Sequence, residues 1–335
     1  SQDVQKFNGR LRYGLETRLS DDWSMGLRLA TGNEGNPITR NVTYGDYDAP
    51  WNTYVDLAYA NYKSKYLVFS GGRFANPFLS TNLLFDDDIT FEGLAFTGVL
   101  PFSFGGAEHR AFLTAGGFPL RELEWSSRDP YLYAAQLGGQ FAIGGSSLGL
   151  GVAYYNFDNV QGQRNAPGST TKNDTAPPFV TKGNTMFDII TDTDPNTGLF
   201  ALVSAYQIAD VSMLLDSGPI GIGEAHEPIH LKVSADYLRN VGYDERDIFQ
   251  RTGLDVKGKV DGYLLELTVG NDNIDQFGRW RVGGSVRHVE RDAVMDSFTD
   301  SDFHRGGTDA EGWTVEILYG LARNTWMQLR YMTAN

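Results

Sequence analysis

The sequence predicts an all-β protein, a transmembrane antiparallel β-barrel, on three observations. Apolar and polar side chains alternate with a period of two along most of the chain, which is the spacing of a β-strand. The connections between the alternating segments are short and long in turn, as in barrels of the bacterial outer membrane, where turns are short and outer loops long. Aromatic side chains gather at the ends of the segments, as they do where a barrel meets the two membrane surfaces.

Composition narrows the class further. The chain has 335 residues, including 39 glycines and 13% aromatic residues, and that glycine content exceeds the roughly 7% of ordinary soluble domains. The absence of cysteine excludes a disulfide scaffold, a Cys-ligated metal and a thiol enzyme. A net charge of −14 argues against nucleic acid as a partner. No apolar run approaches the roughly 18 residues of a membrane-spanning helix.

The N-terminal half supplies eight predicted strands. Their ranges are 7–19, 23–32, 53–63, 66–75, 90–100, 109–118, 130–142 and 147–157. The clearest alternating apolar positions are Leu11, Tyr13 and Leu15, then Trp23, Met25, Leu27 and Leu29, then Val55, Leu57 and Tyr59. Tight turns are predicted at 20–22, 64–65 and 144–146, and a medium connection at 101–108.

The C-terminal half supplies six more, with cleaner alternation. Their ranges are 198–215, 228–240, 260–270, 277–290, 312–322 and 325–333. The alternating apolar positions include Ile229, Leu231 and Val233, then Tyr263, Leu265 and Leu267, then Trp280, Val282 and Val286, then Trp313, Val315 and Ile317. Tight turns are predicted at 271–276 and 323–324, and a medium connection at 216–227.

The long connections are 33–52, 76–89, 119–129, 158–197, 241–259 and 291–311. The longest, 158–197, is rich in Asn, Thr, Gly and Pro and is predicted to be an extracellular loop. We therefore expect residues 1–335 to form a single β-barrel domain.

The two faces of the strands favour a membrane over a soluble sandwich. The face opposite the apolar one is full of Gly, Ala, Ser, Arg and Glu, as expected of a wet lumen. The aromatic residues at segment ends are Trp23, Trp51, Tyr54, Tyr62, Tyr66, Tyr131, Tyr133, Trp313, Trp326 and Tyr331. They are interpreted as interfacial girdles, although aromatic residues also favour strands in general.

Strand parity predicts that both ends of this chain lie on the extracellular side. Bacterial barrels normally have an even strand number and periplasmic termini. About 14 strands are readable here, and one strand before Ser1 and one after Asn335 would give sixteen in the complete protein.

Several stretches resemble the "putative porin" family of Gram-negative outer membranes. They are residues 71–78 (GGRFANPF), 83–88 (LLFDDD), 91–95 (FEGLA), 23–32 (WSMGLRLATG) and 57–60 (LAYA). The similarity is sharp over residues 1–100 and diffuse afterwards. It implies a passive-diffusion barrel of sixteen strands that forms a homotrimer. The chain lacks the Arg- and Gly-rich first strand and the terminal Phe that the family implies.

The sharpest local feature is the segment 76–92, which contains Asp86, Asp87, Asp88 and Glu92. If one strand precedes Ser1, this segment is the third extracellular loop. In general porins, which the chain resembles, that loop folds into the barrel and narrows the pore. Acidic side chains at a constriction favour cations. The alternatives are a solvated surface loop and a calcium site, although the Asp triplet lacks the ligand spacing of an EF-hand.

Basic and acidic residues on the inward faces form a predicted pore wall. They are Arg10, Arg12, Arg28, Arg279, Arg281, Arg287, Arg330, Lys232, Glu266 and Glu316. Arginines opposite an acidic loop would set up a field across the pore and contribute to selectivity. Alternatively, they pair with lumen acids such as Asp56 and stiffen the wall. A single β-bulge reverses the facing of any of them.

The sequence contains no convincing enzyme motif. The five histidines form no H-E-x-x-H pattern, and Pro228 lies between His226 and His230. Ser285 and His288 have opposite parity on one strand, and no G-x-S-x-G motif is present. We therefore predict no enzyme, no metal site and no cofactor.

The sequence thus predicts a porin of the cell outer membrane, in contact with lipid and lipopolysaccharide. Small hydrophilic solutes and ions would diffuse through a water-filled channel, with weak cation preference. One alternative is a substrate-specific channel with a saturable binding site. The other is a secreted soluble β-protein such as a glycoside hydrolase, in which Asp86 and Glu92 would be the paired carboxylates.

Overall fold

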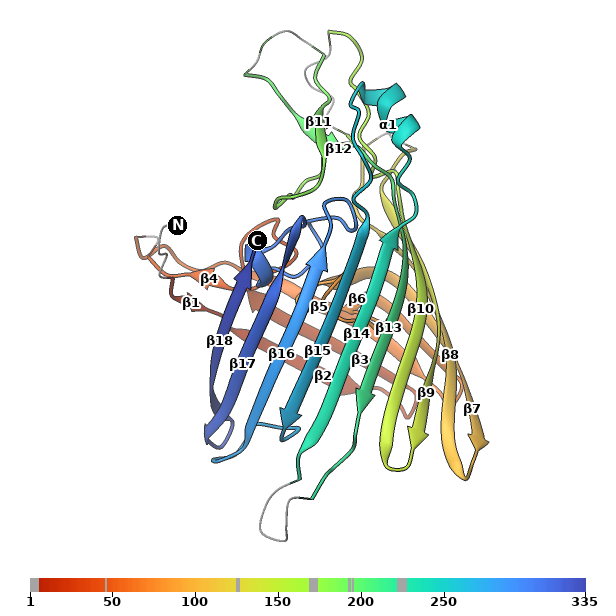
Figure 1. Cartoon of the computed structure of the whole chain (residues 1–335), viewed down its shortest axis with the longest axis vertical. Helices are drawn as coiled ribbons and strands as arrows, with labels where there is room; N and C mark the ends of the chain where they lie inside the picture. The colour runs from red at the N-terminus through yellow and green to blue at the C-terminus, as the bar shows by residue number, and fades with distance from the viewer. Residues whose placement is uncertain are drawn as a thin grey trace.

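Fourteen strands form one curved antiparallel sheet (Figure 1). The computed structural model describes residues 6–45, 47–124, 127–168, 174–191, 194, 196–221 and 228–335. In sheet order the strands are β2 (Arg12–Arg18), β3 (Trp23–Thr31), β5 (Thr53–Lys63), β6 (Leu67–Ala75), β7 (Thr90–Phe104), β8 (Ala107–Pro119), β9 (Tyr131–Ile143), β10 (Ser146–Asp158), β13 (Tyr206–Asp216), β14 (His230–Asn240), β15 (Asp261–Gly270), β16 (Trp280–Val289), β17 (Ala310–Ala322) and β18 (Thr325–Ala334).

Smaller elements lie at the end that carries the long connections, here called the loop end. Strand β1 (Asn8–Gly9) pairs with β4 (Val42–Thr43), and β11 (Met186–Asp188) pairs with β12 (Phe200–Leu202). The α-helix α1 (Glu245–Thr252) and a short 3-10 helix (Phe303–Arg305) complete the structure. Among the described residues, no helix has the length and apolar character needed to span a membrane.

The predicted all-β, antiparallel fold is confirmed, with differences at two connections. The predicted strand 198–215 is two strands, because β12 leaves the main sheet to pair with β11. The predicted medium connection 101–108 is a tight turn at Gly105 and Gly106, whose φ angles of 58° and 80° are left-handed. Glycine takes these angles without steric cost, so β7 and β8 continue to the turn.

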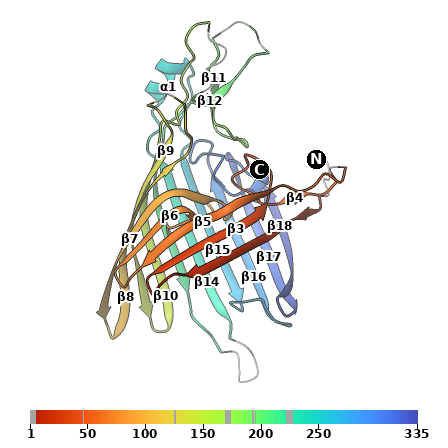
Figure 2. The same cartoon turned by 180° about the vertical axis from the view of Figure 1, so that it is seen from behind.

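The sheet is open: within the described chain, β2 and β18 each pair with one neighbour. Figures 1 and 2 place the start of β2 and the end of β18 at the loop end. Sixteen strands in the complete protein stay a prediction.

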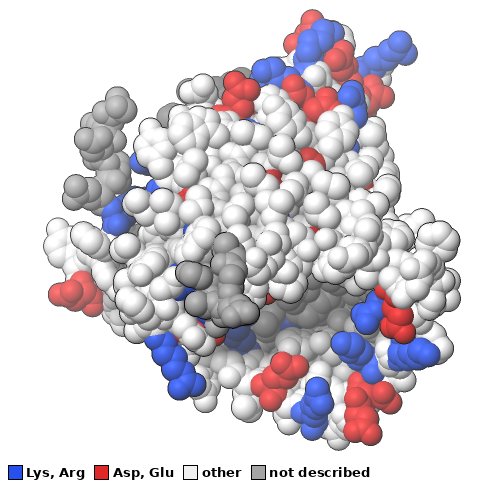
Figure 3. Space-filling model, turned by 60° about the horizontal axis from the view of Figure 1, so that its bottom comes forward, with Lys and Arg blue, Asp and Glu red and all other residues white. Residues whose placement is uncertain are grey.

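The convex face of the sheet exposes large apolar side chains. In β9, Tyr133 and Leu137 are 49% and 64% exposed, whereas Leu132 and Gln136 are buried. Exposed apolar side chains recur around the sheet at Leu27, Leu94, Leu113, Val152, Val211, Leu265, Val282, Val315 and Leu329. Figure 3 shows a broad surface without charged side chains on the wall. Such a belt is covered by lipid in a membrane barrel.

Leu137 lies in the middle of β9, so replacing it by Arg tests the lipid-facing belt. We expect Leu137→Arg to lower the free energy of unfolding in lipid vesicles by about 2–4 kcal/mol, because the charge would lie in hydrocarbon. Phe249→Arg is the control, since Phe249 is 57% exposed on α1, and about 0.5 kcal/mol is expected there. Equal effects of the two variants on urea unfolding would contradict the assignment.

Aromatic pairs lie at the strand ends. Trp23 and Tyr62 pack with ring centroids 5.3 Å apart at the end of the sheet opposite the loop end, here called the tight-turn end. Trp313 and Tyr331 lie 5.5 Å apart at the loop end. These positions agree with the girdles expected at the two membrane surfaces.

Segments 76–89 and 291–309 lie on the concave face and carry an apolar core. Leu83, Phe85 and Tyr155 are between 0% and 2% exposed. Phe85 packs edge-on against Tyr155 at 5.3 Å and also contacts Phe298, at 6.3 Å. Apolar side chains therefore fill part of the inside of the sheet.

A bulge between β3 and β5 changes the predicted facing of one strand. The register shifts between Arg28 and Leu29, so that Asp56 and Leu57 are both buried, at 1% and 9% exposure. Val55 remains exposed, and Leu57 therefore no longer shares its face. Asp56 keeps its predicted inward facing, and arginines surround its carboxylate.

Candidate pore constriction

The segment 76–89 is attached to several walls of the sheet. The Gln136 side chain on β9 accepts a hydrogen bond from Leu79 N at 2.8 Å and donates one to Leu79 O at 2.7 Å. Thr81 Oγ1 donates to Asp236 on β14 at 2.7 Å. Arg287 on β16 donates to the carbonyl oxygens of Asn82 and Leu83. These contacts hold the segment across the concave face.

The aspartate triplet is fixed at two of its three positions. Asp86 accepts hydrogen bonds from Ser301 N at 2.6 Å and Asp88 N at 2.7 Å. Asp88 pairs with Arg10 at 2.9 Å and Arg12 at 2.5 Å. Asp87 is exposed, and no ion pair or hydrogen bond of its side chain is found in the described part of the chain. The central carboxylate is thus free to meet solvent and ions.

A polar cavity of about 410 Å³ lies between this segment and strands β15 to β18. It brings together eight of the predicted site residues, which are Asp86, Asp87, Asp88, Glu266, Glu316, Arg10, Arg287 and Arg330. Gln328, Thr314 and Ser285 add neutral polar groups. Because it brings most of the predicted acidic residues together beside segment 76–89, we regard this cavity as the candidate constriction.

The other predicted site residues lie elsewhere. Arg12 and Arg28 contact Asp56. Arg279, Arg281 and Lys232 lie towards the tight-turn end, where Arg279 pairs with Asp275 and Lys232 with Asp272.

Glu92 pairs with Arg73 and lines a second cavity, which Asp86 does not line. The two carboxylates of the alternative glycosidase interpretation therefore face different cavities.

Acidic groups outnumber cations around the polar cavity. Arg287 pairs with Asp300 at 2.7 Å, and Arg330 with Asp302 at 2.7 Å and Glu316 at 3.3 Å. These pairs satisfy the arginines. Like Asp87, Glu266 has no ion pair or hydrogen bond within the described residues, so two carboxylates remain uncompensated. Such an excess attracts cations.

Residues of the segment 291–309 complete the cavity and were not singled out by the sequence. Ser301 holds Asp86, and Asp300 and Asp302 hold the two arginines. The acidic stretch from Asp296 to Asp302 was a signal that this connection also turns inward. The sequence could not show which strand it would meet.

Burial makes Asp86 and Asp87 sensitive to pH. It raises the pKa of Asp86 to about 6, an effect that the hydrogen bonds from Ser301 and Asp88 only partly offset. The pKa of Asp87 is also raised, because the surrounding protein partly desolvates its carboxylate although the residue reaches solvent, and because Asp300, Asp88 and Asp302 lie nearby. Both carboxyl groups therefore take up protons at a higher pH than ordinary aspartates.

Cation preference is accordingly expected to fall as the pH drops through about 6, because protonation removes negative charge from the cavity. The reversal potential in a salt gradient, measured from about pH 8 to about pH 5, checks this. Asp86→Asn should weaken the change. A reversal potential that stays constant over this range would contradict the expectation.

Asp56 holds three arginines beside the constriction. Its side chain is fully buried and pairs with Arg28 at 2.7 Å, Arg40 at 2.8 Å and Arg12 at 3.7 Å. The cluster joins β2, β3, β5 and the 32–41 connection. It agrees with the alternative in which lumen arginines pair with lumen acids and stiffen the wall.

Replacing Asp56 by Asn should therefore be costly. We expect Asp56→Asn to reduce the free energy of unfolding by about 3 kcal/mol, since three guanidinium groups lose their carboxylate. The matched control is Glu92→Gln, where the Glu92 side chain is 56% exposed and the loss should stay below about 1 kcal/mol. Urea titration in vesicles measures both, and similar losses would count against the role of Asp56.

One histidine lies in a cluster with two carboxylates. The ligand atoms of Asp216, His230 and Asp272 lie within 4.8 Å of one another. Lys232 pairs with both carboxylates, so its ammonium group offsets one of their two negative charges. His226 lies outside the described residues.

Comparison with known proteins places the chain in a family. A search of curated proteins finds no match. Among solved structures, OmpT, an outer membrane protein of Vibrio cholerae, is 12% identical with a TM-score of 0.38, over 97% of this chain and 96% of that one. OccK7 of Pseudomonas aeruginosa is 12% identical with a TM-score of 0.41, over 100% and 73%. Wzi of Escherichia coli, described as a carbohydrate-binding β-barrel, is 12% identical with a TM-score of 0.42, over 97% and 74%.

The antiparallel sheet with its apolar convex face agrees with the class of outer-membrane channel proteins that the family match indicates. The chain belongs to the "putative porin" family, whose sequence model matches residues 1–335. The predicted family and outer-membrane location are thereby confirmed.

Proposed function

We propose that the protein is a porin that lets small hydrophilic solutes and ions diffuse passively through a water-filled channel. The polar cavity of about 410 Å³ carries the proposal, because it has both polar walls and uncompensated charge. Within the predicted segment 76–92, residues 76–89 form the constriction, whereas Glu92 lines the second cavity. The pore wall is made by the arginines and acids of β15 to β18 together with Arg10. The excess of carboxylates gives a weak preference for cations.

The assembly is proposed to be a homotrimer embedded in lipid and lipopolysaccharide. OmpT of Vibrio cholerae is described in a trimer form, and the resemblance of the sequence to general porins implies the same state. The long loop 158–197 is proposed to face the outside of the cell.

Liposome swelling with neutral sugars of increasing size tests the channel directly. We expect small sugars to enter and the rate to decrease steeply with size, without saturation, as for a narrow water-filled hole. Folded protein, identified by heat-modifiable gel migration, that admits no sugar would overturn the proposal.

A second candidate function is a substrate-specific channel with a saturable binding site. One observation favours it, namely a cavity with an apolar lining at the loop end.

A further inference from the structure

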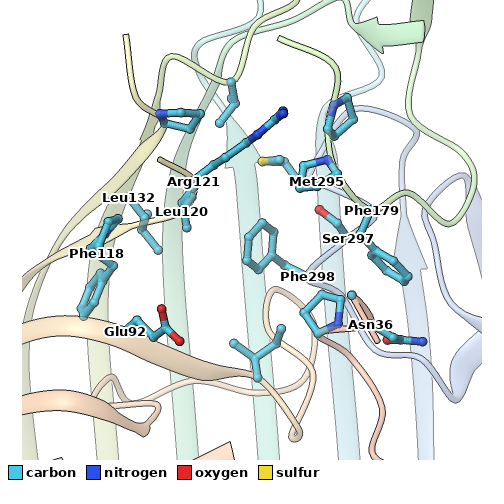
Figure 4. A pocket seen from close by; sticks show the side chains of 18 of the residues that line it. Asn36, Glu92, Phe118, Leu120, Arg121, Leu132, Phe179, Met295, Ser297 and Phe298 are labelled. Carbon is cyan, nitrogen blue, oxygen red and sulfur yellow. The ribbon is translucent and has the colours of Figure 1, made fainter. Parts of the chain in front are cut away.

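The second cavity has a volume of about 510 Å³ and lies at the loop end (Figure 4). Ile89, Thr90 and Glu92 line it, whereas Asp86 to Asp88 line the polar cavity, so the segment 86–92 separates the two. Its apolar lining consists mainly of Phe118, Leu120, Leu132, Phe179, Met295 and Phe298. These side chains come from four separate parts of the chain, namely 118–120, 132, 179 and 295–298.

This apolar surface differs from the lipid-facing belt. It is concave and enclosed by connections, and Figure 4 shows Phe298 in its middle with Phe118 and Phe179 on opposite sides. Lipid covers the convex face of the sheet, not this cavity. Concave apolar surfaces of about 300–1,000 Å³ with a few polar groups are the usual form of small-molecule sites.

The polar groups of the lining define the charge of the molecule that fits. Arg40 is compensated by Asp56, and Arg73 by Glu92. Arg121 Nη1 donates to the carbonyl oxygens of Asp174 and Ala176, at 3.4 Å and 2.9 Å. Asp174 also lines the cavity and is exposed to solvent, but in the described part of the chain no carboxylate forms an ion pair with Arg121.

Among the three arginines of the lining, Arg121 is therefore the one whose charge is met by carbonyl oxygens and not by a carboxylate within the described residues.

We propose that this cavity binds an amphipathic organic anion. Its apolar body packs against Phe118, Phe179 and Phe298, and its acidic group pairs with Arg121. The inference rests on the proposed function, since such a molecule would be a solute that the channel collects at its outer mouth.

Phenylpropanoate is the probe for the test, with phenylpropanol and acetate as partial analogues. Titration calorimetry with the folded protein in nanodiscs should show saturable binding of phenylpropanoate and much weaker binding of the other two. Arg121→Gln should weaken phenylpropanoate binding about tenfold or more, because a charge-assisted contact is lost, and leave phenylpropanol unchanged. Arg121→Lys should retain most of the affinity.

Two further variants keep the test decisive. Arg246→Gln removes an exposed arginine of α1 and should leave binding unchanged. Leu120→Asn should weaken the acid and the alcohol alike, because it alters the apolar wall. Undiminished binding in Arg121→Gln, an equal loss in Arg246→Gln, or acetate binding as tight as that of phenylpropanoate would each overturn the inference.

The calorimetric readout separates this inference from the proposed function. If phenylpropanoate binds but no solute crosses the membrane, the proposed channel function is contradicted and the proposed binding site is supported. If solutes cross but phenylpropanoate does not bind saturably, the binding site is contradicted and the channel function is supported.

Discussion

Replacing Asp87 by Asn together with Glu266 by Gln should remove most of the cation preference of the channel. A unit charge about 6 Å from an ion in water contributes about 0.7 kcal/mol, or roughly threefold in local ion concentration. Two uncompensated carboxylates in one cavity could therefore account for a preference of up to about tenfold. The permeability ratio of K⁺ to Cl⁻ from reversal potentials measures this.

Glu92→Gln is the matched control for this pair. Glu92 belongs to the same acidic segment but pairs with Arg73 and lies outside the polar cavity. Its removal should leave the permeability ratio nearly unchanged. If Glu92→Gln lowers the permeability ratio as much as the double variant does, the polar cavity is not the path that the ions take.

Shortening the inward segment should enlarge the channel. Replacing residues 79–87 by two glycines removes the contacts with Gln136, Asp236 and Arg287 that hold the segment across the concave face. Single-channel conductance should rise by at least about twofold, because the narrowest cross-section is lost.

A control for the shortened variant removes chain from the outer loops instead. Replacing 245–252 by two glycines deletes α1, which lines neither of the two cavities. Conductance should then remain close to that of the unmodified protein. Folded protein that lacks residues 79–87 yet conducts as before would show that this segment does not set the width.

The strands could be predicted from the sequence because their side chains alternate with a period of two. The pattern is local, and β5, β9 and β18 were placed within one residue of their observed ends. The same pattern gave a wrong prediction at 198–215, because Ser204 and Ala205 interrupt the strand. Both residues accept hydrogen bonds from the Asn240 side chain. Helix α1 was missed although Asp244 caps its start and Gly253 ends it, because eight polar-rich residues in a long connection give little periodicity.

The sequence could predict which residue types form the site, but it could not predict which residues they pair with. The charge of Asp86 to Asp88 marks the segment, whereas its pairing with Arg10 joins residues 78 positions apart. The facing of Leu57 depended on a bulge that no local pattern reveals. The role of the segment 291–309 depended on tertiary contacts, such as that between Arg287 and Asp300.

The central claim is that ions cross the membrane through the polar cavity beside residues 76–92. Conductance and reversal potential of the purified protein in a planar bilayer under a salt gradient test it most directly. We predict stepwise openings with a reversal potential of the sign that marks cation preference, decreasing in Asp87→Asn/Glu266→Gln. Folded protein that produces no openings, or openings whose reversal potential indicates anion preference and is unaffected by the two substitutions, would contradict the account.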